Sequence, residues 1–360
     1  HDMGLIMGQL LPVLLGNHTV IMSPNTAVLK PSIWLQAVSR YRAKLTGGPN
    51  FIYDLAASLY SEKKMQGIDL SSWEIAPNGA DVVRKTTLDR FYSVYKKHGF
   101  KMETFMPCYG LAEGTLFVTG GPTRQLPKNV MVEKQALEAE QKVVKTLNTE
   151  IGRVLVGCGE PNWETEIAIV DPDSCKECEI GKVGEIWVSG RAIAAGYWKN
   201  EEVTQKTFHA RVDTIPNKRF LRTGDIGFIG DDGQLYICGR LKDLIICDGR
   251  NLHPEDIEYT IQQAMEKLKP QSCAVFSYDK NARHQVTVAI IETDRELKRI
   301  LAEQADEWRT TIGSSVTDVH GIGLNQIIFI PPATLKKTTS GKVQRGLMKT
   351  LYLNGELETL

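Results

Sequence analysis

The feature that most constrains the fold is a change in hydrophobic pattern along the chain. Up to about residue 150, amphipathic segments of helical length alternate with short apolar runs, which predicts an α/β layered unit with a largely parallel sheet. We expect helices over about 33–41, 51–61 and 81–98, and short strands within 44–50 and 73–77. From about 151 to 240, short apolar runs separated by Gly, Asp and Pro instead predict a β-rich subdomain.

A third pattern begins near residue 242. Expected strands at about 244–247, 272–277, 284–291 and 325–330 alternate with expected helices at about 254–267 and 294–310. Because 360 residues exceed what one hydrophobic core usually holds, we expect two or more packing units. The prediction is a large domain over 1–240, with an α/β part (1–150) and a β-rich part (151–240), and a small α+β domain over 241–360.

Charge and cysteine content bound the partners and the compartment. Lys plus Arg and Asp plus Glu number 43 each, which gives no global electrostatic reason to bind nucleic acid or an anionic membrane. The longest apolar stretch, 5–15, is interrupted and shorter than the roughly 18 residues of a membrane span, so stable membrane insertion is not expected. Seven scattered cysteines fit a reducing cytoplasm, and the isolated Cys175/Cys178 pair is interpreted as part of a polar turn.

Four polar segments carry residues suited to chemistry: MPCYGLAEGT at 106–115, LRTGD at 221–225, GRLKDLIICDGRNLHPEDIE at 239–258 and KKTTSGKVQR at 336–345. Asp225 follows a glycine and can accept hydrogen bonds from a sugar diol, and Lys342 lies in a glycine-containing loop that could face a phosphate or carboxylate. Taken alone, each of these residues is better explained by structure than by function: Tyr109 as a core aromatic, Asp225 as a turn residue and Lys342 as a solvated cation. Neither GxGxxG nor GxxxxGK[ST] occurs, so a dinucleotide fold and a Walker ATPase are not supported.

The order of these segments resembles the adenylate-forming superfamily of acyl-CoA synthetases, adenylation domains and luciferases. Within it the chain is most similar to the fatty acyl-AMP ligases, through HDMGL at 1–5, GGPNFIYDL at 47–55, LSSWEIAPNGADVVR at 70–84, PCYGLAE at 107–113 and GRLKDLIICDGRN at 239–251. The resemblance implies the adenylate-forming enzyme fold: part of a large AMP-binding domain that binds ATP and the acid, and a small mobile C-terminal domain that closes over them.

The resemblance also implies a nucleotide site. Its expected members are Asn78, Gly79 and Ala80 around the adenine, Tyr109 stacked on it beside Gly110, Asp225 on the ribose hydroxyls, and Arg240 beside ribose and phosphate. Glu113 is expected to be catalytic through Mg²⁺, which accompanies ATP, and Lys342 is the expected catalytic lysine. Lys242 and Asp243 are the expected hinge.

The acid is expected near the turn that holds Gly48, Pro49 and Asn50, and near His1, although either could equally be a wall of the fold. The implied reaction is ATP-dependent activation of a fatty acid to an acyl-adenylate, with release of pyrophosphate. Because the substrate carboxylate is the nucleophile, no serine or cysteine triad is needed. The acyl group is then expected to pass to the phosphopantetheine arm of an acyl carrier protein.

Two departures from the family pattern matter. The family's Ser/Thr/Gly-rich phosphate loop lies upstream of the HDMGL segment, so we expect His1 to be an interior residue of a longer protein and this piece alone to be inactive. An insertion is expected at about 121–155, with a charged, solvated helix over about 133–147. Insertions of this kind mark fatty acyl-AMP ligases, in which they hamper the domain rotation needed to form a CoA thioester. The alternatives are a fatty acyl-CoA synthetase and a non-catalytic acyl- or nucleotide-binding module.

Overall fold

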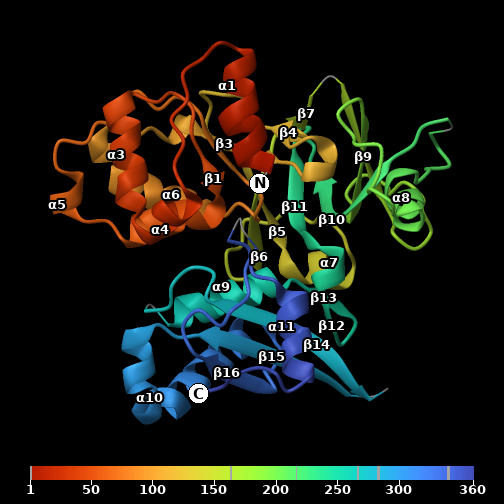
Figure 1. Cartoon of the computed structure of the whole chain (residues 1–360). Coiled ribbons are helices and arrows are strands. Elements are labelled where there is room, and N and C mark those ends of the chain that lie inside the picture. Colours follow the sequence, from red (N-terminus) through yellow and green to blue (C-terminus); the bar gives the residue numbers. More distant parts are fainter. Residues whose placement is uncertain (1, 163, 216, 266, 282–283, 339–340) are drawn as a thin grey trace. The chain divides into compact units, whose positions relative to one another are not determined.

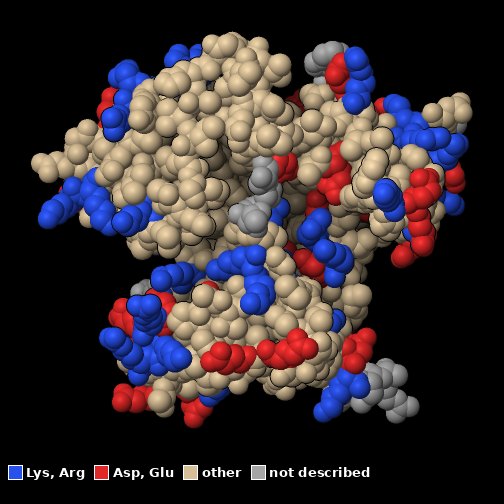
Figure 2. Space-filling view, in the orientation of Figure 1, with Lys and Arg blue, Asp and Glu red and all other residues tan. Residues whose placement is uncertain are grey.

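The computed structural model describes the chain except for residues 1, 163, 216, 266, 282–283 and 339–340 (Figure 1). The chain forms two compact units, His1–Leu241 and Lys242–Leu360. Each unit combines helices with sheets, so the expected α/β class is confirmed. On the face shown in Figure 2, side chains of both signs are present on each unit, as the equal numbers of acidic and basic residues suggest.

The first unit begins with an α/β layer. Its five-stranded sheet has the order β1-β2-β3-β4-β7, in which β1, β2 and β3 are parallel and the other two strands pair antiparallel. The strands are β1 (Gly48–Pro49), β2 (Ala76–Gly79), β3 (Phe105–Tyr109), β4 (Thr119–Gly120) and β7 (Glu160–Pro161). The covering helices are α3 (Pro31–Tyr41), α4 (Asn50–Ser58) and α6 (Lys85–Tyr95), close to the three expected ranges.

An aromatic core joins these helices to the sheet. Tyr53 of α4 and Phe91 of α6 are fully buried, and their rings meet edge to face with centroids 5.2 Å apart. The ring centroid of Phe105 of β3 lies 5.7 Å from that of Phe91, also in a T-shaped contact. The Tyr53 hydroxyl donates to the Pro77 carbonyl at 2.9 Å, which ties α4 to β2. Ring contacts of this kind add to the burial of apolar area and hold the strand ends that follow.

The second part of this unit is a four-stranded antiparallel sheet with the order β11-β10-β9-β8. Its strands are β8 (Thr165–Val170), β9 (Gly184–Gly190), β10 (Leu221–Ile229) and β11 (Leu235–Arg240). Helix α8 (Glu201–Phe208) lies against β10 and begins at Asn200, whose side chain accepts from the Val203 amide. These strands match the expected β-rich pattern.

The region predicted as an insertion differs from the prediction of a long solvated helix. Helix α7 covers only Lys134–Ala139 and buries Ala136 and Leu137, so it contributes to a core. It ends because Gln141 turns the chain at a φ of +52°. The backbone of Lys142 then forms an isolated antiparallel β-bridge with that of Lys182. Flanking strands β5 (Asn129–Glu133) and β6 (Gly152–Val156) form an antiparallel pair.

The second unit is a small α+β domain with helices on both faces of a three-stranded sheet. In this sheet β14 (Cys273–Asn281) pairs antiparallel with β15 (His284–Glu292), which pairs parallel with β16 (Gln326–Ile330). Alternate residues of β14 point to opposite faces, so Val275 packs with α9 (Pro254–Ala264) and Phe276 packs on the side of α11 (Arg345–Leu353). A short pair, β12 (Ile245–Cys247) and β13 (Arg250–Leu252), precedes α9.

Helix α10 (Arg295–His320) extends ten residues beyond the expected end at 310. Its buried stripe continues through Ile312 and Val316, and the left-handed Gly321 ends it. At the other end of the chain, η1 (Met3–Leu10) and α1 (Leu11–Leu14) bury no residue, and Leu14 is 82% exposed. Within the described residues, no helix is both long enough and apolar enough to span a bilayer.

Candidate active site

Three of the predicted nucleotide-site residues lie in direct contact. The Tyr109 hydroxyl donates to Asp225 Oδ2 at 2.7 Å, and Arg240 Nε donates to Asp225 Oδ1 at 2.9 Å. Asp225 on β10 and Arg240 on β11 face each other in the sheet register, while Tyr109 ends β3 of the other sheet. The fold therefore brings together two motifs that are 116 residues apart in the sequence.

The environment of this cluster keeps Tyr109 neutral. Burial raises the pKa of the Tyr109 phenol well above its ordinary value, and the negative charge of Asp225 raises it further. The phenol therefore remains a hydrogen-bond donor to the carboxylate. The Asp225 side chain is 15% exposed and that of Arg240 is 47% exposed, so solvent reaches the cluster from the Arg240 side.

The predicted adenine-site residues lie at the end of β2. Gly79 approaches β3 so closely that an added Cβ would lie 2.5 Å from the Cys108 carbonyl oxygen, and Ala80 has a φ of +64°. Asn78 is fully buried, and its side-chain Nδ2 donates to Asn50 Oδ1 at 3.4 Å. The close packing of β2 on β3 therefore explains the glycine at 79, and the adenine contact of these residues stays a prediction.

The predicted metal ligand, Glu113, lies in a short helical turn after the Tyr109–Gly110 pair. Gly110 is required there because an added Cβ would lie 1.5 Å from the Leu116 carbonyl oxygen. Glu113 Oε1 accepts a hydrogen bond from the Tyr197 hydroxyl at 2.7 Å. Burial, and then the hydrogen bond to Glu113, raises the pKa of Tyr197 to about 12, so this phenol is also neutral.

Sequence reasoning missed Tyr197. It lies 84 residues from Glu113, and no spacing rule connects the two. The Tyr197 amide donates to Thr204 Oγ1 at 2.9 Å, and its ring meets Phe208 of α8 edge to face at 5.1 Å. The glycine before it, in AAGYW, was the only local signal of an unusual turn.

The predicted acyl-site turn lies at the edge of the parallel strands. Gly48 pairs with Asn78 and Pro49 with Gly79, so this turn adjoins the predicted adenine site. Asn50 is 8% exposed, donates to Thr87 Oγ1 at 3.1 Å and accepts from the Arg84 amide at 3.1 Å. These contacts hold Asn50 within the fold, and its place near the acid stays a prediction. His1 lies outside the described residues.

The remaining predicted residues belong to the second unit. Lys342 bonds Thr338 twice: the Thr338 backbone amide donates to the Lys342 carbonyl at 2.8 Å, and the Lys342 backbone amide donates to Thr338 Oγ1 at 3.1 Å. Asp243 of the predicted hinge accepts from Arg345, three residues after Lys342, at 3.2 Å. Arg345 also bonds Glu258 at 2.6 Å and 2.7 Å. Arg345 thus connects the start of α11, three residues after Lys342, to the predicted hinge within this unit.

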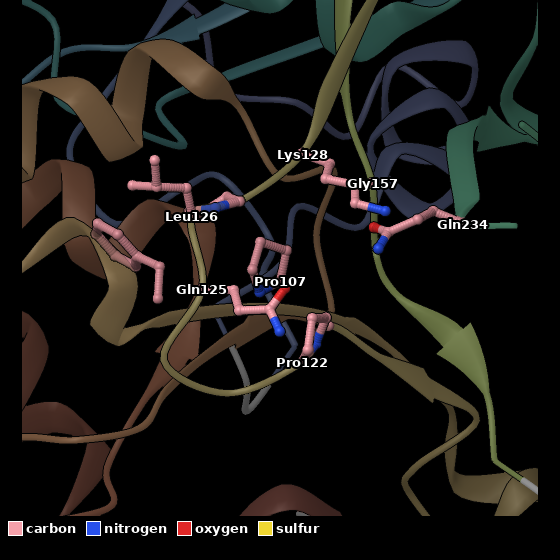
Figure 3. Close-up of a pocket in the computed structure, with 10 residues that line it drawn as sticks. Pro107, Pro122, Gln125, Leu126, Lys128, Gly157 and Gln234 are labelled. Atoms are coloured by element: carbon pink, nitrogen blue, oxygen red, sulfur yellow. The ribbon is translucent and has the colours of Figure 1, made fainter. Parts of the chain in front are cut away.

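The structure has two pockets whose lining includes neither Tyr109 nor Asp225. A polar cavity of about 200 Å³ in the second unit is lined by Lys242, Asp243 and Arg345 among others. In the first unit, a much smaller pocket lies under the connection that follows β4. Figure 3 shows Gln125, Leu126 and Lys128 around it, with Pro107 and Gln234 on neighbouring segments. None of the predicted nucleotide-site residues lines this smaller pocket, so we assign it to packing of the connection.

The described residues hold no group of three or more His, Cys, Asp or Glu side chains that could bind a metal. This arrangement is compatible with Mg²⁺, which commonly binds through one or two carboxylates together with substrate phosphates and water. Glu113 is the residue predicted to supply such a carboxylate. The Cys175/Cys178 pair lies in a turn, where Cys175 has a φ of +57°.

Comparison with known families places both units. A family model described as AMP-binding enzyme matches residues 1–198, and one described as Disco-interacting protein 2-like, AMP domain, matches residues 242–360. Among curated proteins, the chain is 35% identical over 360 residues to the medium-chain-fatty-acid–[acyl-carrier-protein] ligase JamA of Moorena producens. The match covers 99% of this chain and 60% of JamA, so the chain spans about 60% of that relative's length.

Solved structures agree with this result. A structure from a study of fatty acyl-adenylate ligases from E. coli and L. pneumophila superposes with a TM-score of 0.87 at 29% identity, covering 99% of this chain and 60% of that one. The fatty acyl-adenylate ligase from L. pneumophila in complex with acyl adenylate and pyrophosphate superposes with a TM-score of 0.67 at 34% identity. That match covers 100% of this chain and 61% of the other.

Proposed function

Because this chain belongs to the AMP-binding enzyme family, we propose that it serves the ATP-dependent activation of a fatty acid to an acyl-adenylate. The observation that carries the proposal is the contact of Asp225 with both Tyr109 and Arg240. It gathers an aromatic ring, a carboxylate and a guanidinium, which suit the base, the ribose diol and the phosphate of a nucleotide. The similarity to ligases that act on fatty acids supports the choice of acid.

In the proposed reaction, a carboxylate oxygen of the fatty acid attacks the α-phosphorus of ATP. The bond from that phosphorus to the β-phosphate oxygen breaks, and pyrophosphate leaves. Charge accumulates on phosphate oxygens, so the protein contributes mainly by positioning groups and by neutralising charge. Asp225 and Tyr109 would hold the nucleoside, and Lys342 would stabilise the developing charge. A magnesium ion held by Glu113 would neutralise phosphate charge.

The proposed acceptor of the acyl group is an acyl carrier protein. The phosphopantetheine thiol would attack the acyl carbonyl, a thioester would form, and AMP would leave. Support for this acceptor comes from JamA, which is named as an acyl-carrier-protein ligase. The region predicted as an insertion bonds to turns that flank β9 and β10, which would hold it in place if it restricts CoA thioester formation. Val143 donates to the Gly181 carbonyl at 2.8 Å, and Lys145 bonds Asp231 at 2.7 Å.

The test uses the full-length protein with ATP, Mg²⁺ and a panel of saturated fatty acids of different length. Pyrophosphate, acyl-AMP and thioester products are followed together, with either phosphopantetheinylated acyl carrier protein or free CoA as the acceptor. The proposal predicts acyl-AMP with at least one acid, thioester on the carrier protein and little acyl-CoA. Abundant acyl-CoA would make the protein a CoA synthetase. Nucleotide binding without pyrophosphate release from any acid would make it a binding module.

A deletion within the β5–β6 hairpin tests whether the insertion restricts CoA thioester formation. Glu133 and Gly152 face each other in the β5–β6 register, so an Asn-Gly turn can replace residues 134–151 and still close the hairpin. If the insertion restricts CoA thioester formation, this variant should make more acyl-CoA while pyrophosphate release stays largely intact. A Gly/Ser segment of the original length is the matched control, because it keeps the length but removes α7. Unchanged acyl-CoA in both variants would exclude this role.

A further inference from the structure

Glu185 on β9 is a buried carboxylate outside the motifs that indicated the site. It is 2% exposed and makes three hydrogen bonds. Its Oε2 accepts from Arg222 Nε at 3.0 Å and from Arg222 Nη2 at 2.7 Å, and its Oε1 accepts from the Gly224 amide at 3.1 Å. Gly224 immediately precedes Asp225, so one buried side chain holds the turn that carries the predicted ribose ligand.

The sheet register explains why this turn needs a side chain to hold it. Arg222 of β10 faces Trp187 of β9, but Ile226 faces Glu185. Four steps along β10 therefore oppose two steps along β9, and the extra residues form a bulge. In this bulge Gly224 has a φ of +71°, and the Glu185 carboxylate accepts the hydrogen bond of its amide.

The rest of the bulge is held in a similar way. Thr223 Oγ1 donates to the Ile186 carbonyl at 2.7 Å and accepts from the Asp225 amide at 3.1 Å. Both ends of the Gly224 turn are thus fixed to β9, one through Glu185 and one through Thr223. A bulge that is fixed at both ends re-aims the next side chain with little freedom.

We infer that Glu185 is a positioning residue for nucleotide recognition: it holds the β10 bulge so that Asp225 meets the ribose hydroxyls. The inference rests on the proposed function of Asp225. A carboxylate suits the task because its two oxygens serve two partners, the Arg222 guanidinium and the Gly224 amide. A glutamine has one acceptor oxygen and must leave one of these two partners unbonded.

The test compares AMP with 2′,3′-dideoxy-AMP by isothermal titration calorimetry, using the full-length protein. The wild type should prefer AMP by about 10²-fold, since the dideoxy nucleotide lacks both ribose hydroxyls and each hydrogen bond to a charged group contributes about tenfold. In Glu185→Gln, this preference should fall toward that of Asp225→Ala. In the Asp225→Ala background, Glu185→Gln should change the preference no further, because the two residues act through one contact.

The preference ratio separates positioning from plain loss of stability. Partial unfolding lowers the number of active sites and leaves the ratio unchanged. Glu166→Gln on β8 is the matched control, because Glu166 pairs with Lys218 and lies 43% exposed in the same sheet. If Glu185→Gln fails to fold, Arg222→Lys tests the Arg222–Glu185 contact from the other side. Lysine keeps the charge of arginine but cannot make both hydrogen bonds to Glu185.

The possible results are distinct. A wild type that binds both nucleotides equally overturns the role of Asp225 and this inference with it. A wild type that prefers AMP, together with a folded Glu185→Gln or Arg222→Lys variant that keeps the full preference, overturns only the inference. A reduced preference in Glu166→Gln as large as that in Glu185→Gln also overturns it, because the effect would then not depend on the bulge.

Discussion

Replacing Asp225 by alanine should weaken AMP binding by about two orders of magnitude. Hydrogen bonds to a charged group contribute about 1.5–3 kcal/mol each, and two ribose hydroxyls are proposed to bond this carboxylate. Because water satisfies the same groups in the free state, we take the low end of that range. The expected loss is therefore about 3 kcal/mol, or about 10²-fold in Kd.

The same substitution should also lower the stability of the first unit. The Tyr109 hydroxyl donates to Asp225 at 2.7 Å, and Tyr109 is 8% exposed, so the phenol loses a buried acceptor. An unsatisfied buried donor costs about 1–3 kcal/mol. Loss of the Arg240 contact should add little, because that side chain is 47% exposed and water can replace the carboxylate.

Isothermal titration calorimetry with AMP measures the first effect, and denaturant unfolding measures the second. Asp231→Ala is the control, since Asp231 lies just beyond β10 and is 75% exposed in its pair with Lys145. This control should leave AMP affinity unchanged. If Asp225→Ala folds, loses stability and yet binds AMP normally, Asp225 is merely the acceptor for Tyr109 and the proposed ribose contact is wrong.

Three further substitutions test other parts of the proposal and the fold. In the full-length protein, Lys342→Ala should slow acyl-adenylate formation by roughly 10²- to 10³-fold, because one preorganised transition-state donor is lost. Single-turnover pyrophosphate release measures this rate. An equal loss of ATP affinity would make Lys342 a ground-state ligand instead. Glu113→Gln should raise the Mg²⁺ concentration needed for half-maximal pyrophosphate release, and an unchanged Mg²⁺ dependence would exclude it as a metal ligand. Phe91→Ala should lower the free energy of unfolding by about 3–5 kcal/mol in denaturant titration, because Phe91 is fully buried among aromatic rings; a loss below about 1 kcal/mol would contradict the packing described.

Much of the architecture could be predicted from local pattern. The ranges expected for α3, α4 and α6, and for the strands β1, β2, β12, β14, β15 and β16, agree with the structure to within a few residues. Local pattern works here because the period of apolar residues reports directly which face of a helix or strand is buried. The two helices that were misjudged show its limit. The expected end of α10 at 310 was wrong, because Ile312 and Val316 extend its buried stripe, and α7 buries Ala136 and Leu137 although its charged sequence predicted a solvated helix.

The candidate site shows the same difference between what local sequence reveals and what only distant contacts reveal. The residue types and their order are visible in the chain itself: Tyr109, Glu113, Asp225 and Lys342 are identified by their motifs and by family resemblance. Tertiary structure alone decided that the Tyr109 hydroxyl bonds Asp225 across 116 residues, and that Tyr197 bonds Glu113 across 84. It also decided that Glu185 holds the Asp225 turn. Such contacts depend on how two sheets close on each other and on where a strand bulges, and neither leaves a periodic signal in the chain.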